Sequence, residues 1–113
     1  MAVLTPEDLL EQIVAACARS VVVEAYALRT LDPDILRLRV HLVDGSFIEA
    51  FFNTATDRTA FALIAEDQRI YGKDNAKIGW HVHPFDDPKT HLSCLPVSFD
   101  DFLAEVTALR FSA

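Results

Sequence analysis

The strongest constraint on the fold is the segment of residues 35–52, which reads ILRLRVHLVDGSFIEAFF. In its first half, leucine and valine alternate with arginine and histidine, so an extended strand would have one apolar and one polar face. The Asp44-Gly45 pair that follows is a strong signal for a tight hairpin turn. The segment therefore predicts two antiparallel strands with one buried face.

The register of this hairpin follows from what each turn would bury. A two-residue turn would pair Val40 with Glu49 and bring an acid to the apolar face. A three-residue turn with Gly45 in the left-handed conformation pairs Val40 with Ile48 instead, which keeps the core apolar. It also places Arg39 opposite Glu49, two opposite charges. We therefore predict the three-residue turn.

The other face of the hairpin then mixes aromatic and basic side chains, namely Arg37, Arg39, His41, Phe47 and Phe51. A face of this kind usually meets a partner rather than bulk water. The apolar content of 51% is also above what a lone domain needs. A non-catalytic interaction module, working as a homodimer or with another protein, is therefore one hypothesis for the function.

The rest of the chain predicts helices at both ends and further strands between them. Thr5 and Pro6 suit the first positions of a helix that extends to about residue 18, and Ser98 with Asp101 forms a capping box for a second helix. Residues 20–31, 59–64 and 68–71 are expected to be strands. We predict a single α+β domain over residues 1–113, with an antiparallel sheet of four to five strands and both helices packed on one face, a two-layer sandwich. The expected buried stripe of the last helix is Phe102, Leu103, Val106 and Leu109.

The charge balance limits the classes of partner. The chain has 113 residues, 10 basic and 17 acidic, and a net charge of −7, which argues against loose, charge-driven binding to nucleic acid. Residues 69–91 nevertheless sum to +1, so any basic pocket is local. The two cysteines form no disulfide framework, the first residues do not look like a signal peptide and no apolar run is long enough for a membrane span. We therefore expect a cytoplasmic protein.

The basic segment is also the histidine-rich one. Residues 71–91, YGKDNAKIGWHVHPFDDPKTH, hold three of the four histidines within a predicted long loop over residues 72–96. Histidine titrates near neutral pH, so two of them can act as base and acid in one reaction. We predict His83 and His91 as that pair, with His81 in support. Asp74 or Asn75 would orient a histidine.

Cleavage of RNA would use this chemistry, because it needs a base, an acid and cations on the phosphate. Arg69 and Lys73 are expected to bind phosphate, and Tyr71 or Trp80 to stack on a base. Such an enzyme would be a metal-independent ribonuclease without a cofactor.

Two alternatives stay open for the histidines. His81, His83, His91 and Cys94 form an H-x-H-x7-H-x2-C pattern, and imidazole and thiolate are good zinc ligands, although the spacing is looser than in usual zinc sites. An ordinary solvated loop is the other interpretation, because histidines beside proline, glycine and aspartate are common there.

The order of features resembles the TumE-like toxin family. The residues that carry the resemblance are Asp74-Asn75-Ala76, then His81 and His83, with His91 downstream, and it extends over about residues 22–109. The chain departs from the family pattern at Gly72-Lys73, where an arginine and an aromatic residue are expected, and by the four residues 77–80 before the histidine doublet. The resemblance implies a toxin of a toxin–antitoxin pair, with a cognate antitoxin that contains a helix-turn-helix domain. RNA as its target is inferred from the histidine and lysine chemistry.

Overall fold

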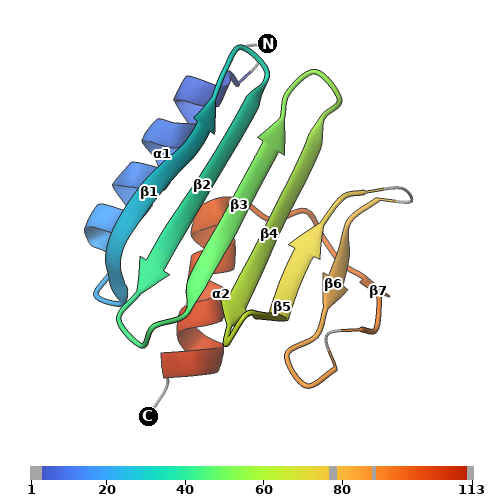
Figure 1. The fold of residues 1–113 in the computed structure, drawn as a ribbon. Coiled ribbons are helices and arrows are strands. Elements are labelled where there is room, and N and C mark those ends of the chain that lie inside the picture. Colours follow the sequence, from blue (N-terminus) through green and yellow to red (C-terminus); the bar gives the residue numbers. More distant parts are fainter. Residues whose placement is uncertain (1–3, 77–78, 88, 112–113) are drawn as a thin grey trace.

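The computed structural model describes residues 4–76, 79–87 and 89–111 (Figure 1). Their helices and strands are, in chain order, α1 (Pro6–Arg19), β1 (Val23–Leu31), β2 (Ile35–Leu42), β3 (Phe47–Asn53), β4 (Arg58–Ala65), β5 (Gln68–Asp74), β6 (His81–His83), β7 (Leu92–Ser93) and α2 (Phe99–Phe111).

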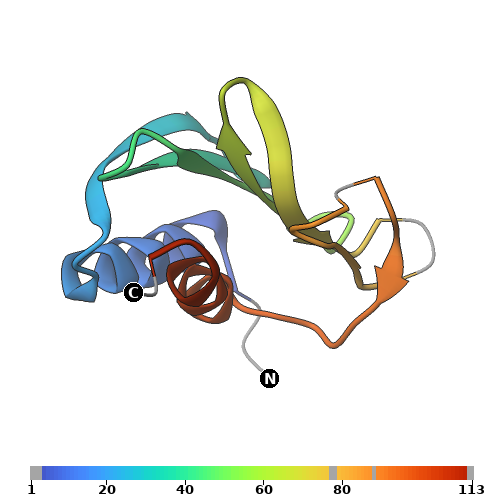
Figure 2. The ribbon, with the colours of Figure 1, turned by 90° about the horizontal axis from the view of Figure 1, so that it is seen from below.

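All seven strands of the described residues form one sheet, in which each strand pairs antiparallel with the next along the chain. The sheet arches over α1 and α2, which both lie on one of its faces (Figure 2). The predicted α+β class with two helices is confirmed. The predicted number of strands was too low, because β6 and β7 lie within the segment that the sequence predicted to be an irregular loop.

The hairpin between β2 and β3 has the predicted register. Val40 faces Ile48 and Arg39 faces Glu49. Gly45 has φ 92°, in the left-handed region that glycine adopts without strain. The sequence therefore predicted correctly which side chains of this hairpin are buried under the helices and which lie on the opposite face, called here the outer face.

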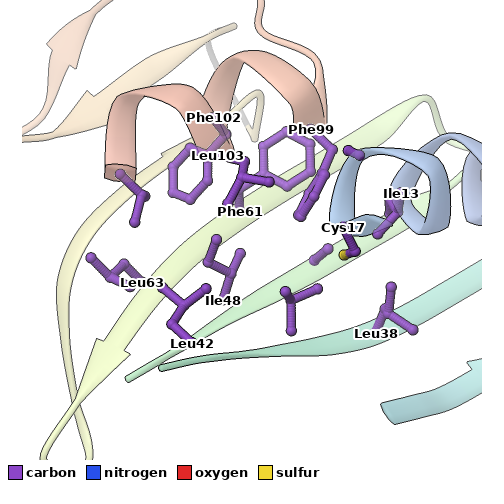
Figure 3. Packing of buried hydrophobic residues seen from close by; sticks show 14 of the residues in the cluster. Ile13, Cys17, Leu38, Leu42, Ile48, Phe61, Leu63, Phe99, Phe102 and Leu103 are labelled. Carbon is purple, nitrogen blue, oxygen red and sulfur yellow. The ribbon is translucent and has the colours of Figure 1, made fainter. Parts of the chain in front are cut away.

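The core lies between the sheet and the two helices (Figure 3). Phe61 of β4 is at its centre, 2% exposed, with ring centroids 5.5 Å from Phe52, 5.9 Å from Phe99 and 5.3 Å from Phe102. Cys17 is buried, and burial raises the pKa of its thiol to about 11. The buried stripe of α2 consists of Phe99, Phe102, Leu103 and Val106. Phe99 was not in the predicted stripe, whereas Leu109, predicted to be buried, is 48% exposed.

Both helix starts are capped as predicted. Thr5 accepts a hydrogen bond from the Asp8 amide, and the Asp8 carboxylate accepts one from the Thr5 amide. Ser98 and Asp101 make the same reciprocal pair at the start of α2. Neither helix has the length and apolar character required to cross a membrane, and the described residues contain no other helix.

Candidate functional site

The candidate site is built on the outer face at the junction of β5 and β6. Asp74, the last residue of β5, pairs with His81, and Gly72 pairs with His83. Residues two apart on a strand share a face. Tyr71 and Lys73 point to α2, where both contact one glutamate, so their neighbours Gly72 and Asp74 and the two paired histidines lie on the outer face.

One carboxylate joins two of the histidines. The Oδ1 atom of Asp74 lies 3.1 Å from Nε2 of His81, and its Oδ2 atom lies 3.3 Å from Nε2 of His83. The same carboxylate accepts a hydrogen bond of 3.0 Å from the Ala76 amide. The side chains are largely buried, with exposed fractions of 12% for His81 and 3% for His83. Asp74 therefore contacts both rings, and it is one of the two residues expected to orient a histidine.

The third histidine comes from the segment that precedes β7. His91 is exposed, and its ring centroid lies 4.3 Å from that of His83 and 5.2 Å from that of His81. Each of the three rings offers one nitrogen that lies within 4.8 Å of the others. The pairing of β7 with β6, with Ser93 opposite His81, brings this segment to the site. The trio His81, His83 and His91 is called the histidine cluster below.

The surroundings of His83 lower the pKa of its ring. Burial is the main cause that lowers its pKa, and the positive charge of Arg69 lowers it further, although the hydrogen bond to Asp74 acts in the opposite direction. A neutral ring that donates from Nε2 to Asp74 has its lone pair on Nδ1, an assignment inferred from the hydrogen-bond partners. This buried Nδ1 has no hydrogen-bond partner among the described residues. A buried acceptor without a partner is costly, so the atom is suited to receive a proton or a cation.

His81 has an acceptor at both ring nitrogens. Its Nδ1 lies 3.1 Å from the carbonyl oxygen of Gly79, which can only accept, so Nδ1 carries a hydrogen. Its Nε2 then faces the Asp74 carboxylate at 3.1 Å. Two lone pairs would repel each other at this distance, and a proton or a metal ion on Nε2 removes the conflict. Nε2 of His81 can therefore donate a hydrogen to Asp74 or bind a metal ion beside it.

The histidine cluster opens into a cleft of about 460 Å³. Its other lining side chains include Trp80, one of the two residues expected to stack on a base, and the guanidinium-bearing Arg58 and Arg69. A Cβ at Gly72 would lie 3.0 Å from the backbone oxygen of Phe61 and 3.3 Å from the Arg69 Cδ atom, so glycine leaves room for both. Two arginines beside the His83 imidazole make an environment for an anion. Arg58 was missed by the sequence reading; its position opposite Asn53, next to the hairpin turn, places it on the outer face.

Two residues predicted to bind substrate lie on the helix-covered face instead. The Lys73 ammonium pairs with the Glu105 carboxylate at 2.9 Å. The Tyr71 hydroxyl donates to the same carboxylate at 2.8 Å, and its ring stacks on Phe102 with centroids 5.5 Å apart. Burial, and then Glu105, raise the pKa of Tyr71. Neither side chain lines the cleft of the histidine cluster.

Asn75 supports the site without contacting a histidine. Its side-chain oxygen accepts from the Thr59 amide at 2.8 Å, and its side-chain amide donates to the Asp57 carbonyl at 2.7 Å. These bonds tie the end of β5 to the start of β4. Asn75 therefore fixes the backbone beside Asp74.

Cys94, the fourth residue of the predicted zinc pattern, is not part of the group of converging ligand atoms in the described residues. Its backbone amide donates to the Trp80 carbonyl at 3.2 Å. Burial is the largest influence on the thiol and raises its pKa, which disfavours the thiolate that a metal needs. The histidines, rather than a three-histidine and cysteine set, form the candidate metal site.

Comparisons of this chain with protein families, with curated proteins and with solved structures found no match. The resemblance to the TumE-like toxins therefore rests on Asp74-Asn75-Ala76 and the histidines.

Proposed function

We propose that this protein is a toxin-like enzyme that cleaves RNA at the histidine cluster, and that a transition metal ion such as Zn²⁺ bound there takes part. The observation that carries the proposal is the convergence of three imidazoles within 4.8 Å, one of them with a buried, unpartnered nitrogen. Three protein ligands leave the fourth position of a tetrahedral site open for water, which is the arrangement of catalytic zinc.

The hydrogen bonds around the cluster support a metal. Histidines that bind metals usually donate their other N–H to a carboxylate or a backbone carbonyl. His83 has Asp74 as this partner and His81 has the carbonyl of Gly79. Zinc–nitrogen bonds of about 2.0–2.1 Å require ligand atoms about 3.4 Å apart in a tetrahedron. Small rotations of the rings, above all of the exposed His91, would bring them to this spacing.

The cleft fits a phosphodiester as substrate. A bound metal would supply an activated water at neutral pH. Arg58 and Arg69 would bind the phosphate and stabilise the charge that develops on it. His81, His83 and His91 would bind the metal, Asp74 would orient His83, and Trp80 would stack on a neighbouring base.

A metal-independent acid–base mechanism is the second candidate, because the same contacts of Asp74 would also orient a base and an acid. Neutral His83 has a free lone pair and can act as base, while His81, held between two acceptors, can act as acid. This differs from the His83 and His91 pair expected from the sequence. Ring centroids 4.3–5.2 Å apart leave no room for a phosphoryl group between the rings, so the phosphate would lie beside the cluster, in the cleft.

The first experiment measures metal and cleavage together. Protein purified without a metal-affinity step is analysed for metal content, and wild type and His83→Ala are incubated with a labelled RNA, with and without a chelator. We expect close to one equivalent of metal, and cleavage that chelator and substitution both abolish. Cleavage that persists in chelator favours the acid–base mechanism, and no cleavage under any condition refutes the enzyme.

The toxin role has a separate test. An antitoxin with a helix-turn-helix domain would neutralise the enzyme and is expected to be encoded in the neighbouring gene. Expression of wild type in a host without that gene should slow growth, whereas expression of His83→Ala should not. Equal growth with both proteins refutes toxicity. The hypothesis of a non-catalytic interaction module would then remain, with the mixed face of β2 and β3 as the contact surface.

A further inference from the structure

We propose that the outer face of β2–β6 is a binding track for single-stranded RNA that ends at the histidine cluster. This inference rests on the proposed function, since it supplies the substrate path of the same site. It uses the part of the molecule that faces away from both helices (Figure 2).

The strand register aligns the track with the site. One row of directly paired positions crosses the sheet from β2 to β7 through Arg37, Phe51, Ala60, Asp74, His81 and Ser93. A neighbouring row runs through Arg39, Glu49, Ala62, Gly72 and His83. The arginine and aromatic end of the face is thus continuous with the histidine end.

The arginines of β2 lie over the aromatic rings of β3. The guanidinium carbon of Arg37 is 4.6 Å from the ring centroid of Phe51, and that of Arg39 is 4.3 Å from that of Phe47. Arg37 is exposed, so its guanidinium plane is available from solvent. Unpaired bases stack on aromatic rings and on arginine planes, and they do so with little sequence preference.

The charge of this face is opposite to that of the whole protein. The strand positions on the outer face of β2–β6 carry four arginines, Arg37, Arg39, Arg58 and Arg69, against the carboxylates of Glu49 and Asp74. The face therefore has a charge of +2 with neutral histidines, in a chain of net charge −7. Such a contrast favours an anionic occupant over a second copy of this acidic chain.

The middle of the outer face carries small side chains. Ala60, Ala62 and Gly72 separate the arginine and aromatic end from the histidines. Strands lie about 4.8 Å apart, so Phe51 on β3 and His81 on β6 are about 14 Å apart across the sheet. A single strand can lie over this floor with one base on the arginine and aromatic end and a phosphate at Arg69. A duplex hides its bases and cannot stack in this way.

Binding is tested separately from cleavage. The protein is His83→Ala in the presence of EDTA, and the probe is a fluorescein-labelled oligouridylate 12-mer, measured by anisotropy at low salt. Phe51→Ala should weaken binding by about tenfold or more, as for loss of one stacked base. Arg37→Gln should lower the slope of log affinity against log salt by about 0.7. Arg19→Gln is the matched control, since Arg19 lies on α1 with a side chain 65% exposed.

Several results would overturn the track. These are no binding by a folded protein, equal losses for Arg19→Gln and Arg37→Gln, or equal affinity for a 12-base-pair duplex. A dimer in sedimentation that Phe51→Ala converts to monomer would assign the face to protein contact instead. Intact cleavage with unchanged binding in the face variants refutes the track alone, whereas RNA binding without any cleavage refutes the enzyme alone.

Discussion

Asp74→Asn is the substitution that tests the site most sharply. The change keeps the shape of the side chain but replaces one acceptor oxygen by an amide donor. If the remaining oxygen stays on the Ala76 amide and His81, the new NH₂ group faces Nε2 of His83. His83 must then accept at Nε2 and carry its hydrogen on Nδ1, the buried nitrogen that the proposal assigns to the metal.

The expected effect is a specific loss of metal affinity. Removal of a carboxylate that orients a ligating histidine typically costs about 10- to 100-fold in metal affinity. The fold should be nearly unchanged, because the substitution fills the same volume and the Ala76 bond is retained. Metal-dependent cleavage should fall at limiting metal and recover at high metal.

The assay is competition for Zn²⁺ against a coloured chelator at pH 7, with nitrogen NMR to identify the protonated nitrogen of His83. Asp86→Asn, at an exposed position on the segment after β6, is the control. Unchanged zinc affinity together with a retained Nε2–H tautomer would refute the reasoning. Reduced cleavage that is independent of zinc at every concentration would point to the acid–base mechanism.

Three further predictions concern the fold and its titration. Phe61→Ala, at a position 2% exposed among three other phenylalanines, should destabilise the protein by about 3–5 kcal/mol in urea unfolding, and a loss below about 1 kcal/mol would contradict its central place in the core. Because the pKa of His83 is lowered in the folded protein, the unfolded chain binds a proton at this residue at a higher pH than the folded chain does. The free energy of unfolding should therefore decrease as pH falls from 6.5 to the folded pKa of His83. A metal-free His83→Gln protein should lose that part of the pH dependence. The Cys17 thiol, buried and with a pKa raised to about 11, should react with a thiol reagent at pH 8 only after unfolding, and rapid labelling of folded protein would refute its burial.

The correct structural predictions concern features that a few residues close in sequence determine. The β2–β3 register was predictable because a slip would have moved Glu49 into the core. Both capping boxes follow from residues three apart in sequence, which find each other without help from the rest of the chain.

The two last strands could not be predicted in this way. β6 has three residues and β7 has two, so their conformation comes from the strand they pair with rather than from their own composition. Glycines and prolines around them indicated a loop. The same pairing brings His91 to the other two histidines, which no spacing in the sequence could show.

A β-bulge separates Tyr71 and Lys73 from Arg69. The three residues alternate in sequence and would share one face of a regular strand. In the structure Ile64 pairs with Arg69 and Leu63 with Tyr71, so Ile70 is an extra residue on β5. The bulge turns Arg69 to the outer face and leaves Tyr71 on the helix side. A single inserted residue of this kind leaves no sequence signal.

Because β6 and β7 are so short, the histidine cluster can lose its geometry while the core stays folded. The core is closed by β1–β5 and the helices, while His81, His83 and His91 depend on five backbone pairings at the margin of the sheet. Opening such a margin exposes little apolar surface and costs far less than global unfolding. We expect amides of β6 and β7 to exchange with solvent much faster than those of β2–β4. Fraying of this margin would therefore take the histidine cluster apart while the rest of the protein stayed folded, and local refolding would restore it.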